Sequence, residues 1–230
     1  SINITAQGAA TTFRIGSPVN ASGIGGQGGL GGSAPFFDAG AGGVGGAGEG
    51  GSIGLLAFDG AALSITATSG TLRLDAGADG GVGGNGGTGL SGTGTPGTNG
   101  SATGGSVGLV ASTAGLTVTG NLVADVAALG NFDQRTGATG ADATGGSAFI
   151  NAADDGDFLV TGGLWIDASA KAAIGELSAG TARGGVVDLL MDGAGSSFTI
   201  QGLFPIAGFP VGPRLRFEDE QAAKEAGDAE

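Results

Sequence analysis

The chain has 230 residues, 55 of them Gly, and a formal net charge of −13 at pH 7. It contains no Cys, His or Tyr, which excludes disulfides, thiolate metal sites and a histidine base. Only 8 Lys and Arg stand against 21 Asp and Glu, so the composition argues against nucleic acid and anionic membrane surfaces as partners.

No apolar run approaches the roughly 18 residues that a membrane-spanning helix needs, so we expect no membrane insertion. The absence of Cys is compatible with a secreted bacterial surface protein. Because Ser1 opens directly into a predicted strand, we expect no signal peptide within this chain. If the protein is exported, we therefore expect this chain to be a processed or excised piece.

The stretch 51–76 holds three short apolar runs, at 53–57, 63–66 and 72–75, each bounded by Gly, Ser or Asp. Apolar residues alternate with period two within each run, which is typical of a strand with one buried face. The same triplet of strands recurs at 2–6, 13–15 and 18–21; at 107–111, 116–118 and 122–125; at 148–152, 158–160 and 164–167; and at 187–191, 198–200 and 203–206.

These five units begin near residues 1, 51, 105, 146 and 185. Their spacing varies because an insertion of changing length follows the third strand. The insertions occupy 22–50, 77–104, 127–145 and 169–184. Insertions confined to one corner are what stacked repeats tolerate. The sequence thus predicts an all-β fold, a parallel β-helix solenoid of about five coils over residues 1–207.

The first two insertions repeat glycine pairs every third residue, as in 24–33, 42–47 and 81–88. Three residues per turn is the period of polyproline II and polyglycine II helices, whose bare edges can approach other chains. We expect extended there-and-back legs that stack as a side layer, with Phe36 and Phe37 at one tip. The alternative is that the insertions are mobile Gly-rich linkers.

The end of the chain differs in composition from the repeats. Residues 208–230 combine Pro and Phe with an acidic tail. Because an open stack end exposes strand edges and apolar core, we predict that the Pro/Phe stretch covers it. The acidic tail, 218–230, is predicted to be a short helix or a frayed end.

The cadence GGSxxLxA…LxVTGxLxxDA at 104–125 and 145–168 resembles repeats of filamentous-haemagglutinin-like adhesins and autotransporter passenger domains of Gram-negative bacteria. The likeness covers nearly all of residues 1–207. It implies a right-handed β-helix, export across the outer membrane and a role in adhesion, biofilm or extracellular fibres. The glycine-triplet insertions depart from this family and look more like mycobacterial glycine-rich surface repeats.

Two catalytic motifs occur in form only. Residues 50–54 and 104–108 match the G-x-S-x-G nucleophile elbow, but no histidine exists to act as base, so we interpret both as turns entering a strand. Residues 84–89 match G-x-G-x-x-G without the required strand and helix context. We predict that the protein is not an enzyme.

Asp75, Asp125 and Asp167 each end a predicted third strand, and Asn20 holds the equivalent place in the first unit. Stacked in register, they would form a column with about 4.8 Å between repeats. Calcium would offset the repulsion between these carboxylates. Alternatively, each Asp caps its corner turn by accepting backbone N–H bonds. No other metal or cofactor is expected.

We expect a structural protein of the cell surface or of extracellular filaments, which associates with itself or adheres through a stiff rod. The alternative is a monomeric module excised from a secreted adhesin that binds a glycan or host protein. A polysaccharide-degrading enzyme using paired carboxylates is the remote alternative. Candidate self-association residues are Ile2, Ile4, Phe36, Phe37, Phe204 and Phe209.

Overall fold

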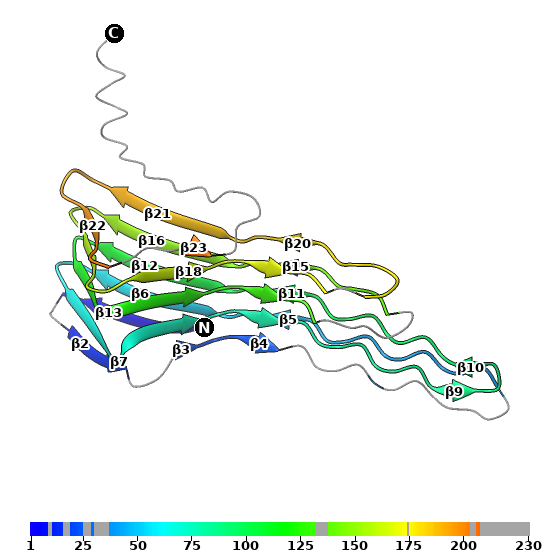
Figure 1. Ribbon diagram of the computed structural model, residues 1–230. Helices are drawn as coiled ribbons and strands as arrows, with labels where there is room; N and C mark the ends of the chain where they lie inside the picture. Colours follow the sequence, from blue (N-terminus) through cyan, green and yellow to red (C-terminus); the bar gives the residue numbers. More distant parts are fainter. Residues whose placement is uncertain are drawn as a thin grey trace, which may run out of the picture.

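The computed structural model describes residues 1–8, 11–15, 19–24, 29, 37–131, 138–173, 175–202 and 206–207. These residues form strands and loops (Figure 1), and no helix among them is long and apolar enough to cross a membrane. Four of their five sheets are parallel, so the predicted all-β class with parallel strands is confirmed. The predicted end cap and acidic tail at 208–230 lie outside the described residues.

Sheet A collects the first predicted strand of every unit. Its order, β1-β6-β12-β16-β21, follows the chain, and every neighbouring pair is parallel. The register matches equivalent positions throughout, for example Ile53 with Val107. The strands are β1 (Ile2–Gln7), β6 (Ser52–Phe58), β12 (Ser106–Ser112), β16 (Ser147–Ala153) and β21 (Val186–Asp192).

Sheet B collects the second and third predicted strands. It contains β2 (Thr11–Ile15), β3 (Val19–Asn20), β7 (Ala62–Asp75), β13 (Gly115–Asp125), β17 (Asp157–Val160), β18 (Leu164–Asp167), β22 (Ser197–Ile200) and β23 (Ile206–Ala207). In two units the predicted pair of strands is one continuous strand, β7 or β13. Gly70 and Gly120 lie at the bends with positive φ angles of 75° and 101°, which glycine adopts without strain.

The core lies between sheets A and B and is built from alternate residues of each strand. In β12 and β13, for example, Leu109, Leu116 and Leu122 are fully buried, while their sequence neighbours face outward. Phe158 and Phe198 stack in the same core with ring centroids 5.1 Å apart. Burial of one face thus fixes the register, because a shift of one residue would turn every apolar side chain outward.

A pair of glycines precedes most strands of sheet A. At this place the segment that returns from an insertion passes close to the segment that enters it. The Gly105 N–H donates to the carbonyl of Ala76 at 2.7 Å, and Gly146 donates likewise to Val126 at 2.8 Å. A Cβ on Gly105 would overlap the carbonyl oxygen of Gly51 in the repeat below. The glycines of the Gly-Gly-Ser motif are therefore needed because two backbones pass close to each other there.

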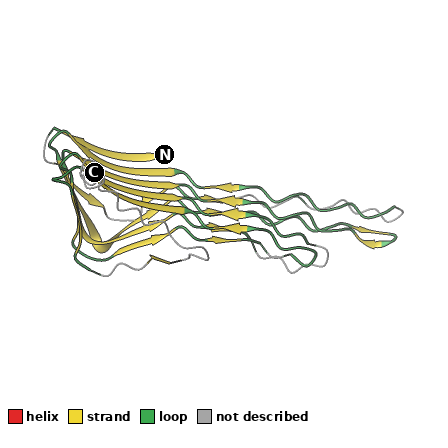
Figure 2. Ribbon diagram, turned by 90° about the horizontal axis from the view of Figure 1, so that it is seen from above, coloured by secondary structure: helices red, strands yellow, loops and turns green. Residues whose placement is uncertain are grey.

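The insertions project from one corner as an arm with two layers (Figures 1 and 2). The outgoing sheet has the order β19-β14-β8-β4 and the return sheet the order β20-β15-β11-β5, all parallel. The outgoing strands are β4 (Gly23–Ile24), β8 (Ala78–Asp79), β14 (Ala128–Leu129) and β19 (Ala170–Lys171). The return strands are β5 (Gly48–Glu49), β11 (Ala102–Thr103), β15 (Ala143–Thr144) and β20 (Ala182–Arg183).

Alanine forms the small core between these two layers, because only a short side chain fits there. Ala78, Ala102, Ala128 and Ala143 are buried together. Near the tip, β9 (Thr88–Gly89) and β10 (Gly92–Thr93) form an antiparallel hairpin. The arm thus has its own buried contacts, beside the main core.

Beyond the short strands, three glycine-rich legs at 40–48, 81–87 and 94–101 are bonded to one another. The N–H groups of 42, 45 and 48 donate to the carbonyls of 95, 98 and 101. Those of 81, 84 and 87 donate to 46, 43 and 40, and those of 94, 97 and 100 donate to 87, 84 and 81. Every third residue of each leg therefore donates one hydrogen bond, and legs of two different insertions hold one another in place.

Candidate functional site

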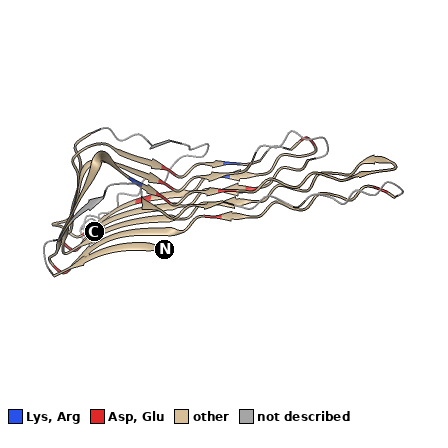
Figure 3. Ribbon diagram, turned by 90° about the horizontal axis from the view of Figure 1, so that it is seen from below, with Lys and Arg blue, Asp and Glu red and all other residues tan. Residues whose placement is uncertain are grey.

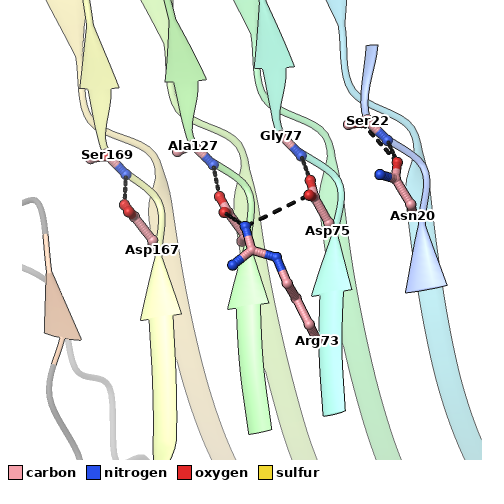
Figure 4. A network of polar contacts seen from close by, with 9 residues as sticks. Asn20, Ser22, Arg73, Asp75, Gly77, Ala127, Asp167 and Ser169 are labelled. Atoms are coloured by element: carbon pink, nitrogen blue, oxygen red, sulfur yellow. Dashed lines mark hydrogen bonds and ion pairs between the residues drawn. The ribbon is translucent and has the colours of Figure 1, made fainter. Parts of the chain in front are cut away.

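The predicted column of polar side chains lies at the corner where sheet B passes into the outgoing sheet. Asn20 is in register with Asp75, Asp75 with Asp125, and Asp125 with Asp167 (Figure 4). A hollow of about 280 Å³ opens over this corner, and its lining includes the three carboxylates, Ser22 and Asp79. Figure 3 shows charges of both signs where the sheets pass into the arm.

Each member of the column caps its own turn. The backbone N–H two residues further on donates to the side-chain oxygen: Ser22 to Asn20 at 2.8 Å, Gly77 to Asp75 at 3.2 Å, Ala127 to Asp125 at 3.2 Å and Ser169 to Asp167 at 2.9 Å. The turn-capping interpretation of these residues is therefore confirmed. An amide in the first unit performs the same task as a carboxylate in the others, so the cap itself needs no charge.

Arg73 supplies positive charge within the column. It lies two residues before Asp75 on the outward face of β7, and its guanidinium pairs with both Asp75, at 3.7 Å, and Asp125 of the next repeat (Figure 4). Sequence reasoning missed this role. The sequence did contain a signal for it: Arg73 and Asp75 are two residues apart, and this spacing places both side chains on one face of a strand.

The pKa of Asp125 is raised above its ordinary value. Burial of the carboxyl group is the largest cause, and the neighbouring charges of Asp75 and Asp167 add to it. The hydrogen bond from Ala127 and the charge of Arg73 act in the opposite direction. The ionised form of Asp125 is thus less favourable in the folded chain than in water.

The column does not have the geometry of a metal site. It offers one carboxylate per repeat, and the described residues hold no group of three or more Asp, Glu, His or Cys placed to bind a metal ion. Calcium needs six to eight oxygen ligands around one point. The structure therefore gives the predicted calcium column of Asp75, Asp125 and Asp167 no support.

The two Gly-x-Ser motifs lie in sheet A. Ser52 and Ser106 are the first residues of β6 and β12 and pair with each other in register. Both follow the glycine crossing described above. The interpretation as turns entering a strand fits this position.

The predicted self-association residues lie at two separate places. Ile2 and Ile4 are half-buried in β1, at the edge of sheet A. Phe37 lies at the arm tip with 74% of its surface exposed, next to the equally exposed Leu90, whose N–H donates to the Phe37 carbonyl at 3.0 Å. Sequence reasoning missed Leu90. Phe36, Phe204 and Phe209 lie outside the described residues.

Comparisons with known proteins gave no match: no family model, no curated protein and no solved structure corresponds to this chain. The resemblance to adhesin repeats therefore stays a prediction from the sequence.

Proposed function

We propose that the chain is a parallel β-helix that serves as a structural module of an extracellular or cell-surface protein. In-register pairing of equivalent strands supports a solenoid of five coils, since sheets A and B each gain strands unit by unit. The right-handed sense is taken from the resemblance to adhesin repeats. The backbone ladders between coils would make this body stiff along its axis.

The arm fits the same proposal as a bundle of polyglycine-II-like legs. Three residues per turn and hydrogen bonds to neighbouring legs at every third residue are what this conformation requires. Such a bundle is rigid without a large apolar core. It would broaden one side of the body and hold the exposed Phe37 and Leu90 beside the β9–β10 hairpin near its tip.

The proposal of self-association rests on the two edge strands of sheet A, each of which has one side without a partner strand among the described residues. Within the described residues β1 pairs only with β6, and β21 pairs only with β16. Unpaired parallel edges are templates for another strand. If one copy continued the register of the next, Ile2 would lie beside Val187 and Asn3 beside Asp188.

Electron microscopy and sedimentation velocity of the purified protein test this proposal, in EDTA and again with calcium. We expect regular fibres in EDTA, because the ladder needs no metal. Asn3→Asp should weaken assembly, since it faces Asp188 of the next copy with a like charge, and Asn3→Lys should strengthen it. Dispersed rods in both buffers, or equal effects of the two variants, would contradict end-to-end stacking.

The second candidate is a module that binds a ligand as a single copy. A hollow beside the exposed side chain of Trp165 on sheet B favours this candidate.

A further inference from the structure

The outward face of the third-strand region of sheet B carries three rows of side chains, which we call the C-face. Strands β7, β13 and β18 contribute one residue each to most rows. The middle row is Arg73, Val123 and Trp165; one flanking row is Thr71 and Asn121, and the other is Asp75, Asp125 and Asp167. Val123 and Trp165 thus form an apolar strip between an amide and hydroxyl row and a carboxylate row, and Arg73 lies at one end of the strip.

A hollow of about 230 Å³ lies on this strip. Trp165 lines it with Thr71, Asn121, Val123 and Gly163. Gly163 precedes β18 and has no side chain, which leaves the space beside the indole open. Trp165 is 41% exposed, whereas Leu164 and Ile166, its neighbours in β18, point inward and are buried.

The polar rim of the hollow is held in place. The Asn121 side-chain oxygen accepts the Gly163 N–H at 2.8 Å, and its amide nitrogen lies 3.5 Å from the Thr71 hydroxyl. These contacts fix the amide and leave the Thr71 hydroxyl at the edge of the apolar surface. A rigid aromatic surface with fixed polar groups beside it is the usual composition of a small-molecule site.

The lining of the hollow fits a pyranose ring. Such a ring has an apolar C–H face and a rim of hydroxyl groups. The face would pack against Trp165 and Val123, while hydroxyl groups would bond to Thr71 and Asn121, which line the same hollow.

The charged residues near the hollow limit the class of sugar that can bind there. Three carboxylates and one guanidinium flank the strip, and the chain carries a net charge of −13. An anionic polysaccharide would be repelled, whereas neutral and amino sugars would not. We propose that the C-face binds a neutral or amino-substituted oligosaccharide through Trp165, Asn121 and Thr71. This site goes beyond the structural role and does not require self-association.

Intrinsic fluorescence tests the site directly, because Trp165 is the only Trp of the chain and Tyr is absent. The protein is titrated with cello-, chito- and chitosan oligosaccharides and, as the anionic comparison, with oligogalacturonate. Sedimentation velocity first establishes a concentration at which one species is present, so that assembly and sugar binding are measured separately. We expect a saturable change in Trp165 emission with a neutral or amino sugar, and none with oligogalacturonate.

Variants are measured by calorimetry, which needs no tryptophan. Trp165→Ala should weaken binding about tenfold or more, and Trp165→Phe should retain part of it. Phe149→Ala removes a similarly exposed aromatic ring from sheet A and should leave binding unchanged. No saturation with the non-anionic sugars at about 1 mM would overturn the proposal, as would unchanged binding by Trp165→Ala.

Discussion

Single glycines decide where two backbones can touch in this protein. Gly105 lies at the crossing between the arm and sheet A, where a Cβ would overlap the carbonyl oxygen of Gly51. Gly108, three residues later on β12, has no heavy atom within 4 Å of the place where a Cβ would be. The same residue type is therefore required at one position and replaceable at the other.

This contrast gives the first prediction at the residue scale. We expect Gly105→Ala to lower the free energy of unfolding by about 3 kcal/mol, because a backbone crossing cannot move aside for the methyl group. Gly108→Ala is the matched control and should raise it by about 0.5 kcal/mol, since Ala costs less entropy in a strand. Urea unfolding of both variants measures the difference. Similar losses in the two variants would contradict the crossing.

The raised pKa of Asp125 gives the second prediction at the residue scale. A carboxyl whose folded pKa exceeds its unfolded value of 3.8 stabilises the fold most below pH 3.8, and this contribution is lost as the pH rises through the folded pKa. Asp125→Asn keeps an acceptor for the Ala127 N–H, as Asn20 does for Ser22. We therefore expect Asp125→Asn to be more stable than the unsubstituted protein at pH 7, with a gain that shrinks as the pH falls toward 3.8.

The comparison variant is Asp125→Ala, which loses the acceptor and should be about 1 kcal/mol less stable than Asp125→Asn at every pH. Urea unfolding between pH 3.5 and 7 measures all three proteins. If the advantage of Asp125→Asn grew as the pH fell, the raised pKa would be contradicted.

At the scale of elements, the arm shows how two insertions become one body. The return leg of the first insertion donates to the return leg of the second at every third residue, and both bond to the leg at 81–87. No leg could satisfy its backbone groups alone, because an extended helix of this kind has no internal hydrogen bonds. The arm is therefore stable only as a bundle.

Gly97 tests the bundle, because a Cβ there would overlap the carbonyl oxygen of Gly43 in the neighbouring leg. We expect Gly97→Ala to speed amide hydrogen exchange in the legs at 40–48, 81–87 and 94–101 about tenfold or more, with little change in sheet A. Thr98→Ala is the control, since that side chain is exposed. Unchanged exchange in the Gly97→Ala legs would contradict the packing.

At the scale of the whole molecule, the stacked sheets and the arm share one corner but depend on different contacts. The stack is held by its alternating apolar core, and the arm by backbone hydrogen bonds and a small alanine core. Repeats contact only their neighbours, so damage should remain local. This separation is why variants of the arm, the C-face and the edge of sheet A can be interpreted independently.

The sequence alone predicted much of this arrangement. Period-two alternation predicted the strands, and the triplet glycines predicted extended legs, because both patterns are local properties of a few residues. The recurrence of Asp75, Asp125 and Asp167 at equivalent positions predicted their shared register. The continuous strands β7 and β13 were not predicted, because the apolar pattern shows two separate runs in each unit, whereas the chain only bends between them, at Gly70 and Gly120.

Only the tertiary structure decided which distant groups meet. Arg73 pairs with Asp125, Gly105 lies against Gly51, and Trp165 borders a hollow with Asn121. Each of these contacts joins residues roughly one repeat apart in the chain, and its geometry depends on insertion lengths that a local pattern does not constrain. The sequence therefore determined which elements form, and the stacking of repeats determined which side chains share a site.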